Sequence, residues 1–279
     1  MSGYKLAYCI DSSYSMPLAV SLRTLLEHWI GGRTLDVFVF ENGLSAADKR
    51  KVENSLPQVS CYNLRWVSVD PAEVTGLPTG LHFSAANYFR LLLPRLLPDL
   101  DYVLYLDADT LISDDLGSLF AHYDEKFPLQ ACQDYCGTIS NPLIRLPNYT
   151  EFGLAADSPY FNTGVLLMNL KKWREEKIAE KVIRLGREHP ETLFFADQTP
   201  INVALAGKIG RLPPEWNTQI VHPRVLDGSW KMPFVPQDIA ARKILHYTSE
   251  FKPWSLGRGL PQAGLFHAVL SRTAWAMKR

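Results

Sequence analysis

The sequence predicts an α/β fold built around a doubly wound sheet. Short β-rich segments alternate with longer segments of helical periodicity through the first part of the chain. One β-rich segment, Asp101–Leu106, is apolar at almost every position, which is typical of a strand inside a sheet that helices cover on both faces. Ligands of such sheets bind beyond the carboxyl ends of the strands.

The first two strand–helix units have clear local signals. Lys5–Ile10 reads as a strand, and Met16–Trp29 reads as a helix because its apolar side chains recur at helical spacing. Those side chains are Leu18, Leu22, Leu25, Leu26 and Trp29. Thr34–Phe40 is the second strand. Ser45–Leu56 is the next helix, because Ser45 is a good capping residue and Asp48 follows three positions later.

The alternation continues to residue 106 and then weakens. Leu64–Val69 is predicted as a strand and Ala86–Leu96 as a helix that precedes the apolar strand. Beyond Asp134 the chain is richer in proline, and its later elements are a strand at Val165–Leu170 and helices near Lys172–Glu188 and Thr199–Ala206. Because no internal repeat interrupts the chain, we expect one domain with elaborated loops in its second half.

The composition excludes one class of partner. Hydrophobic residues make up 47% of the 279 residues, 29 lysines and arginines balance 29 aspartates and glutamates, and the formal net charge is zero. Such a balance is typical of a globular protein, and it argues against nucleic acid as a partner, since phosphate neutralisation needs a basic excess. A small anionic ligand needs only a local positive patch or a metal ion.

The sequence predicts a cytoplasmic location. No apolar run approaches the roughly 18 residues that cross a membrane, and the first residues do not have the pattern of a signal peptide. The cysteines, Cys9, Cys61, Cys132 and Cys136, are too few for a disulfide framework in a chain of this length, so we expect reduced thiols.

The strongest local motif is an Asp-x-Asp sequence directly after the apolar strand. Asp107 and Asp109 are two residues apart, so on an extended chain their carboxylates point the same way. Two like charges at one place repel unless a cation joins them, and Mg²⁺ or Mn²⁺ prefers such oxygen ligands. The alternative is a solvated strand-to-loop turn.

A second cluster lies far along the chain. His246 offers an imidazole that suits Mn²⁺, and Lys252, six residues later, can reach a phosphate oxygen. The alternative is a buried histidine beside an aromatic-rich turn that ends at Trp254.

These signals belong to a larger set of ordered blocks. The blocks are Asp11-Ser12-Ser13-Tyr14, Tyr88-Phe89-Arg90-Leu91, Val103–Asp109, Tyr160–Trp173, Asp197-Gln198, and His246-Tyr247 with Lys252-Pro253-Trp254. Together they resemble the bacterial nucleotide-sugar glycosyltransferases of family 8, the group of the lipooligosaccharide galactosyltransferases and, more distantly, glycogenin. The resemblance runs from Lys5 to about Trp254. It implies a GT-A type single domain with a doubly wound, Rossmann-like mixed sheet and acceptor-site loops in the second half.

The resemblance implies a UDP-sugar donor and assigns residues to it. Asp11 would accept a hydrogen bond from the uracil, Tyr14 would stack on its ring, and Ser13, where the family often has asparagine, would lie near the ribose. Arg90 would approach the sugar and phosphates, unless it is an ordinary surface arginine. The donor site also takes in Asp107, Ala108, Asn162, Thr163, Ser249, which replaces a common glycine, and Lys252.

The same resemblance implies a metal site and a reaction. Asp107, Asp109 and His246 would hold Mn²⁺ (or Mg²⁺) on the diphosphate, where metal and Lys252 offset the charge of the departing UDP. The catalytic residues would be Gln198, Asp197 and Asp134, around the transferred hexose. The family retains the anomeric configuration, and because an amide is a poor nucleophile, displacement on one face of the sugar is favoured over a covalent intermediate.

The predicted function is a retaining, Mn-dependent transfer of glucose or galactose from a UDP-sugar to a hydroxyl of a cell-surface glycan or glycolipid acceptor such as lipopolysaccharide. One alternative is a sugar-nucleotide nucleotidyltransferase, although Asp11–Pro17 is not the Gly-rich loop that such enzymes have. The other is a catalytically inactive UDP-sugar-binding module.

The last residues form a separate feature. We assign residues 1–254 to the glycosyltransferase domain and 255–279 to a basic tail, within which Gln262–Lys278 has an amphipathic helical pattern. Such a helix suits peripheral contact with anionic lipid at the inner face of a membrane. The alternative is a helix docked on the protein's own core.

Overall fold

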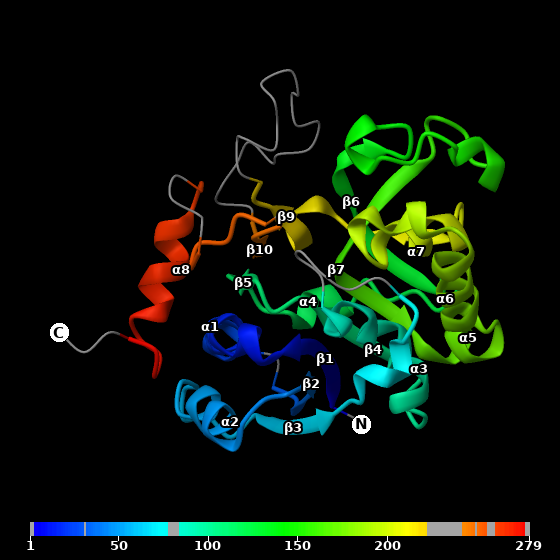
Figure 1. Ribbon diagram of the computed structural model, residues 1–279. Coiled ribbons are helices and arrows are strands. Elements are labelled where there is room, and N and C mark those ends of the chain that lie inside the picture. Colours follow the sequence, from blue (N-terminus) through cyan, green and yellow to red (C-terminus); the bar gives the residue numbers. More distant parts are fainter. Residues whose placement is uncertain are drawn as a thin grey trace.

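The structure is a computed structural model that describes residues 3–30, 32–77, 84–221, 242–248, 250–255 and 260–276. Its main sheet has seven strands in the order β3-β2-β1-β4-β7-β6-β8 (Figure 1). These strands are β1 (Tyr4–Asp11), β2 (Leu35–Asn42), β3 (Tyr62–Ser68), β4 (Tyr102–Leu106), β6 (Leu129–Thr138), β7 (Pro159–Asn169) and β8 (Ile209–Arg211).

The main sheet is mixed. The strands β1, β2, β3 and β4 are mutually parallel, whereas β7 is antiparallel to both β4 and β6. The predicted α/β single-domain fold with a mixed, doubly wound sheet is therefore confirmed. The apolar strand predicted at 101–106 is β4, and it lies in the middle of the sheet, between a parallel and an antiparallel neighbour.

A second sheet has three strands in the order β5-β10-β9. They are β5 (Thr110–Ile112), β9 (Thr218–Gln219) and β10 (Ile244–His246). Strand β10 is antiparallel to β5 and parallel to β9. The periodicity did not indicate these strands, because each is only two or three residues long.

Helices cover both faces of the main sheet. They are α1 (Ser15–His28), α2 (Ala46–Glu53), α3 (Leu93–Leu96), α4 (Gly117–Phe120), α5 (Leu170–Glu175), α6 (Ile178–Glu188) and α7 (Gln198–Ala204). A further helix, α8 (Ala263–Leu270), packs against α1. Strand β1 shows why both faces are apolar: Leu6, Tyr8 and Ile10 pack in one cluster, with α1, while Ala7 and Cys9 pack in the other.

Two helix predictions are corrected. The segment predicted as one helix at Ala86–Leu96 is a 3₁₀ helix, η3 (Ala85–Leu92), followed by the short α3. Pro94 lies in the first turn of α3, where its missing N–H leaves no bond unmade, and it cannot continue an α-helix from the preceding turn. The helix predicted at Lys172–Glu188 is broken into α5 and α6, because Lys177 has a φ of 51° and that conformation ends a helix.

The second half holds strands that the periodicity described badly. Strand β7 begins at Pro159, six residues before the predicted start, and it ends at Asn169, whose side chain caps α5 by accepting from the Lys172 N–H at 2.9 Å. Strand β6 was not predicted at all. Its register with β7 shifts near Gln133 and again before Thr138, and such irregular strands lose the alternation of apolar side chains.

The C-terminal helix packs on the protein itself. Helix α8 lies beside α1 (Figure 1) and buries Phe266 and Val269 in a cluster with Val20 and Tyr247. Beyond α8, the Arg272 guanidinium pairs with Glu27 of α1 at 2.8 Å. Phe266 and Val269, two apolar side chains of the predicted amphipathic helix, therefore contact the protein's own core, whereas Leu265 is 46% exposed.

The predicted helix at Gln262–Lys278 is too long. Helix α8 ends at Leu270, after which the Thr273 hydroxyl donates to the Leu270 carbonyl and accepts from the Trp275 N–H. Local hydroxyl bonds of this kind compete with the helical ladder. Among the helices that the structure describes, none is long and apolar enough to cross a membrane.

Candidate active site

The Asp-x-Asp sequence forms the turn that joins the two sheets. Asp107 follows the last residue of β4, and Asp109 precedes β5. Two hydrogen bonds fix the turn: the Asp107 N–H donates to the Gly164 carbonyl at 2.8 Å, and the Thr110 hydroxyl donates to the Asp107 carbonyl at 2.8 Å. The two carboxylates thus lie at the carboxyl edge of β4, as the sequence predicts.

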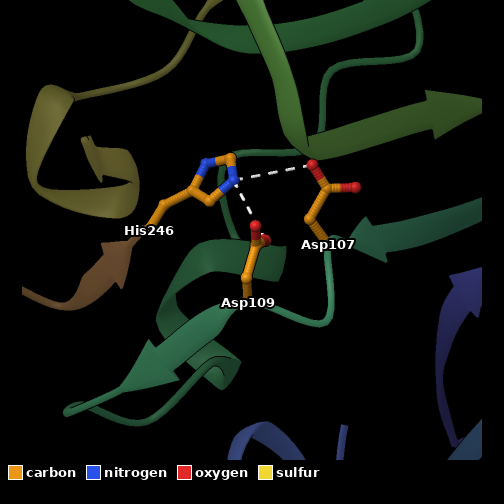
Figure 2. Close-up of side chains that lie close together, drawn as sticks. All are labelled: Asp107, Asp109 and His246. Atoms are coloured by element: carbon orange, nitrogen blue, oxygen red, sulfur yellow. Dashed lines mark ion pairs between the residues drawn. The ribbon is translucent and has the colours of Figure 1, made fainter. Parts of the chain in front are cut away.

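The register of the second sheet brings His246 to this turn. His246 is the last residue of β10 and pairs with Thr110 of β5. Its Nε2 lies 3.2 Å from Asp109 Oδ1 and 3.5 Å from Asp107 Oδ2 (Figure 2). One ligand atom from each of the three residues lies within 4.8 Å of the others. The structure therefore brings the three predicted metal ligands together, with the histidine 3% exposed.

The donor set fits a divalent cation. Asp109 Oδ1 is buried and accepts no hydrogen bond with good geometry, although an imidazole nitrogen is nearby. Buried acceptors without a partner are rare in folded proteins. Two carboxylates and one imidazole are ligands that Mn²⁺ and Mg²⁺ accept. The alternative of a solvated turn does not fit Asp109, which is 6% exposed.

Lys252 completes this cluster from 143 residues away. Its ammonium donates to Asp109 Oδ2 at 2.5 Å and to the Tyr247 carbonyl at 2.7 Å. Burial lowers the pKa of Lys252, but the charge of Asp109 outweighs it, so the pKa lies above its ordinary value. Burial likewise raises the pKa of Asp109, but the charge and hydrogen bond of Lys252 act against burial, and that pKa lies well below its usual range. Both groups are therefore charged.

Arg90 is a buried residue that joins two carboxylates. It lies on η3, is 4% exposed, and contacts Asp107 Oδ1 and Asp197 Oδ2 at 3.1 Å each. Its guanidinium also donates to the Thr163 carbonyl and lies 4.5 Å from the centre of the Tyr105 ring. The alternative of a surface arginine is wrong.

Asp197 and Asp134 have unusual environments. Burial raises the pKa of Asp197 to about 6, although the neighbouring Arg90 opposes that shift. Burial also raises the pKa of Asp134, against hydrogen bonds from the Cys136 N–H, Asn162 and Gln198. Titratable groups with raised pKa values in a polar cluster are frequent at functional sites.

Amide side chains surround Asp134. Asn162 Nδ2 and Gln198 Nε2 donate to Asp134 Oδ2 at 3.0 and 3.1 Å. Gln198 Oε1 accepts from the Thr163 N–H at 3.1 Å and from Asn162 Nδ2 at 3.3 Å. Four of the predicted residues, from β6, β7 and α7, thus form one hydrogen-bonded network, the amide network.

The residues predicted to bind the base and ribose lie at the carboxyl end of β1, which runs parallel to β4. Asp11 Oδ1 accepts from the N–H of Ser13 at 2.9 Å and from its hydroxyl at 2.5 Å. Tyr14 lies edge-on to Trp254, with ring centres 5.8 Å apart, and burial raises its pKa to about 12. The positive charge of Lys252 acts against burial and lowers the pKa of Tyr14.

Two of the residues predicted to bind the donor present no side chain to the site in the described structure. The Ala108 side chain packs in the apolar cluster that contains α1, so a donor could contact only its backbone. Ser249 lies outside the residues that the structure describes.

The sequence analysis missed three residues that shape the site. Tyr105 donates to Asp107 Oδ1 at 2.6 Å, and its position two residues before Asp107 on a strand was the available signal. Gly164 belongs to a recognised block without an assigned role; a Cβ there would overlap the His246 imidazole and lie 2.8 Å from Asp107 Oδ2. Asn217, whose Oδ1 is 3.0 Å from His246 Nδ1, had no local signal.

The chain is similar to known proteins over almost its whole length. It is 24% identical over 277 residues to General stress protein A of Bacillus subtilis (strain 168), covering 96% of this chain and 93% of that protein. It is 25% identical to the lipopolysaccharide 1,2-glucosyltransferase of Escherichia coli (strain K12), and the match covers 96% of this chain and 78% of that protein. It is also 25% identical to the lipopolysaccharide 1,3-galactosyltransferase of Salmonella typhimurium, and that match covers 98% of this chain and 79% of that protein.

Solved structures agree with these relatives. The crystal structure of the galactosyltransferase LgtC with donor and acceptor sugar analogs superposes with a TM-score of 0.78 at 25% identity, covering 96% of each chain. The apo structure of the bifunctional glycosyltransferase WbbM superposes with a TM-score of 0.80 at 24% identity, covering 99% of this chain and 51% of that one, and shows the fold. The fold is thus the GT-A fold, as predicted.

The family model described as glycosyl transferase family 8 matches residues 5–256. That match includes β1, the Asp-x-Asp turn, the amide network and both His246 and Lys252. The chain therefore belongs to glycosyltransferase family 8.

Proposed function

We propose that the protein is a retaining, Mn-dependent hexosyltransferase that moves glucose or galactose from a UDP-sugar to a hydroxyl of a cell-surface glycan such as lipopolysaccharide. The main support is the single observation that Asp107, Asp109 and His246 meet beside Lys252 at the edge of the sheet. Relatives named as lipopolysaccharide glucosyl- and galactosyltransferases support the acceptor class and the hexose.

The charged residues suit a diphosphate. Asp107, Asp109 and His246 would hold the metal, which when bound supplies Lewis-acid stabilisation to a departing phosphate. Lys252 adds a fixed positive charge next to Asp109. Since both the ammonium and the carboxylate are buried, their charges act in a medium of low effective dielectric.

The sugar would lie against the amide network. Asp134, Asn162 and Gln198 present carboxylate and amide groups that can bond to hydroxyls. Asp197 pairs with Arg90, whose guanidinium also donates to the Thr163 carbonyl. These residues would orient the hexose and exclude water from its reacting carbon.

The environment of Gln198 favours displacement on one face of the sugar. Its Oε1 already accepts from the N–H and hydroxyl of Thr163 and from Asn162. An amide oxygen engaged by several donors is a poor nucleophile. We therefore assign Gln198 an orienting role, and we assign deprotonation of the acceptor hydroxyl to an oxygen of the leaving UDP.

The test is a panel of UDP-sugars incubated with the protein and Mn²⁺, with UDP release and product anomers measured by NMR. We expect release from UDP-glucose or UDP-galactose, its loss after chelation, and an α-linked product. Binding of the UDP-sugar without release of UDP would identify a binding module, and formation of UTP and sugar 1-phosphate from the UDP-sugar and pyrophosphate would identify a nucleotidyltransferase. A trapped glycosyl-protein adduct would contradict the one-face displacement.

The C-terminal tail, assigned as 255–279, is proposed to bring the protein to its acceptor at the inner face of the membrane, from a cytoplasmic location. Because Phe266 and Val269 are buried, this contact would depend on the exposed Leu265 and on basic side chains such as Arg272. Flotation with anionic liposomes measures it, and recovery of no protein in the lipid fraction contradicts it.

A further inference from the structure

The orientation of Asn162 is determined by groups that cannot exchange their roles. Its Oδ1 lies 2.9 Å from the Gly164 N–H, which can only donate. Its Nδ2 lies 3.0 Å from Asp134 Oδ2. The amide of Asn162 therefore has one arrangement of oxygen and nitrogen, and its Oδ1 faces Asn217.

The hydrogen bond to Asn162 fixes the orientation of the Asn217 amide. Asn217 is 3% exposed, and its Nδ2 donates to Asn162 Oδ1 at 2.8 Å. Its Oδ1 consequently faces His246 Nδ1 at 3.0 Å. Because an amide oxygen only accepts, His246 Nδ1 must carry the hydrogen.

The remaining nitrogen of His246 faces the carboxylates. Nε2 lies 3.2 Å from Asp109 Oδ1 and 3.5 Å from Asp107 Oδ2 (Figure 2). In the neutral ring with hydrogen on Nδ1, Nε2 carries a lone pair that can bind a cation between these oxygens. A group that hydrogen-bonds to the other ring nitrogen of a metal-binding histidine orients the ring, and its loss usually lowers metal affinity.

The fold holds Asn217 where this contact is made. It is the last residue of a 3₁₀ helix, η7 (Pro214–Asn217), and it leads directly into β9. Strand β9 pairs with β10 in a register that places Gln219 opposite His246. The backbone of both residues is thus fixed within one small sheet.

We propose that Asn217 is a positioning residue that selects the Nδ1–H tautomer of His246 for metal binding and links the metal site to the amide network of Asn162, Gln198 and Asp134. The proposal rests on the metal site of the proposed function. It gives Asn217 two hydrogen bonds that can be tested separately: Asn217 accepts one from His246 and donates the other to Asn162.

Two substitutions separate these tasks. Asn217→Leu removes both hydrogen bonds at similar volume, and we expect the Kd of Mn²⁺, measured by electron paramagnetic resonance of the free ion in the presence of UDP, to rise about 10- to 100-fold. Asn217→Asp keeps an acceptor for His246 but replaces the donor to Asn162. We expect its Mn²⁺ affinity to stay near that of the unaltered protein while UDP release slows.

Asn169→Ala is the matched control. Asn169 is also buried, and it also makes two hydrogen bonds, to the Glu125 carbonyl and from the Lys172 N–H, but it lies at the opposite end of β7 from Asn162. Its substitution should lower stability and leave the Kd of Mn²⁺ unchanged. Equal losses of Mn²⁺ affinity in Asn169→Ala and Asn217→Leu would overturn the proposal.

The tautomer can also be observed directly. In protein with ¹⁵N-labelled histidine and bound Mg²⁺, we expect the His246 resonances, assigned with His246→Gln, to show a protonated Nδ1. Hydrogen on Nε2 alone would overturn the proposal whatever the variants do. If the unaltered protein binds no Mn²⁺, the metal of the proposed function fails as well, whereas unchanged affinity in a folded Asn217→Leu defeats only the role of Asn217.

Discussion

The two sides of the site hold their residues by different interactions. The charged side consists of Arg90, Asp107, Asp109, His246 and Lys252, and the amide side consists of Asp134, Asn162, Gln198 and Asn217. Ion pairs dominate the first, whereas hydrogen bonds of an amide network dominate the second. Charges suit an anionic diphosphate, and directed hydrogen bonds suit neutral hydroxyls. Under the proposed function, this division would let a chain of zero net charge bind an anion at one local site.

The largest expected effect is the loss of a carboxylate on the charged side. Asp109→Asn should lower UDP release by about 10³-fold, because it removes a charged ligand of the metal that would stabilise the developing charge of the departing phosphate. Chelation of the unaltered protein should give a similar loss. Asp124→Asn, a change at an exposed aspartate that pairs with Lys126, is the control, and a comparable loss there would remove the distinction between site and surface.

The second effect is on stability. Arg90→Leu leaves the buried Asp197 without its partner, and breaking a buried pair in this way costs about 3 to 5 kcal/mol. Urea denaturation measures the change. Arg272→Ala removes a pair with Glu27 in which Arg272 is 49% exposed, so it should cost no more than about 1 kcal/mol. Equal costs for the two arginines would contradict the buried role of Arg90.

The third effect depends on pH. The pKa of Asp197 is about 6 in the folded state against an ordinary value of 3.8. Between these values the folded state binds more protons than the unfolded state, so the free energy of unfolding falls as pH rises through this window and then stays level.

The contribution of Asp197 is at most about 3 kcal/mol, since one pKa unit corresponds to about 1.4 kcal/mol. Asp197→Asn should therefore flatten the profile of unfolding free energy between about pH 4 and pH 6, measured by urea denaturation. The difference between the two profiles isolates this carboxyl from the others. An identical slope in both proteins would show that Asp197 titrates normally.

The smallest expected effect lies on the amide side. Gln198→Ala removes one donor to Asp134, and the loss of such a hydrogen bond costs about 1.4 kcal/mol, or about tenfold in UDP release. Initial rates with a saturating UDP-sugar measure it. A loss as large as that of Asp109→Asn would indicate a covalent role for Gln198 and would erase the contrast between the two sides.

The regular part of the fold was predictable because its signals are local. The spacing of Leu18 and Leu22 predicted α1, and the apolar run at 101–106 predicted β4. Strand β6 escaped prediction because its register shifts interrupt the alternation of side chains. Family resemblance, rather than periodicity, supplied Asp134, Asn162 and Gln198.

By itself the sequence determined that two aspartates follow a central strand and that the chain belongs to an α/β class, because both depend on neighbours a few residues apart. Family resemblance implied that His246 and Lys252 join Asp109, but the physical cause lies in the tertiary structure. The pairing of β10 with β5 brings His246 to the turn, and Lys252 reaches Asp109 from 143 residues away. The tertiary structure alone decided the polarity of Asn217, because the direction of a hydrogen bond depends on partners that sheet register, and not sequence spacing, brings together.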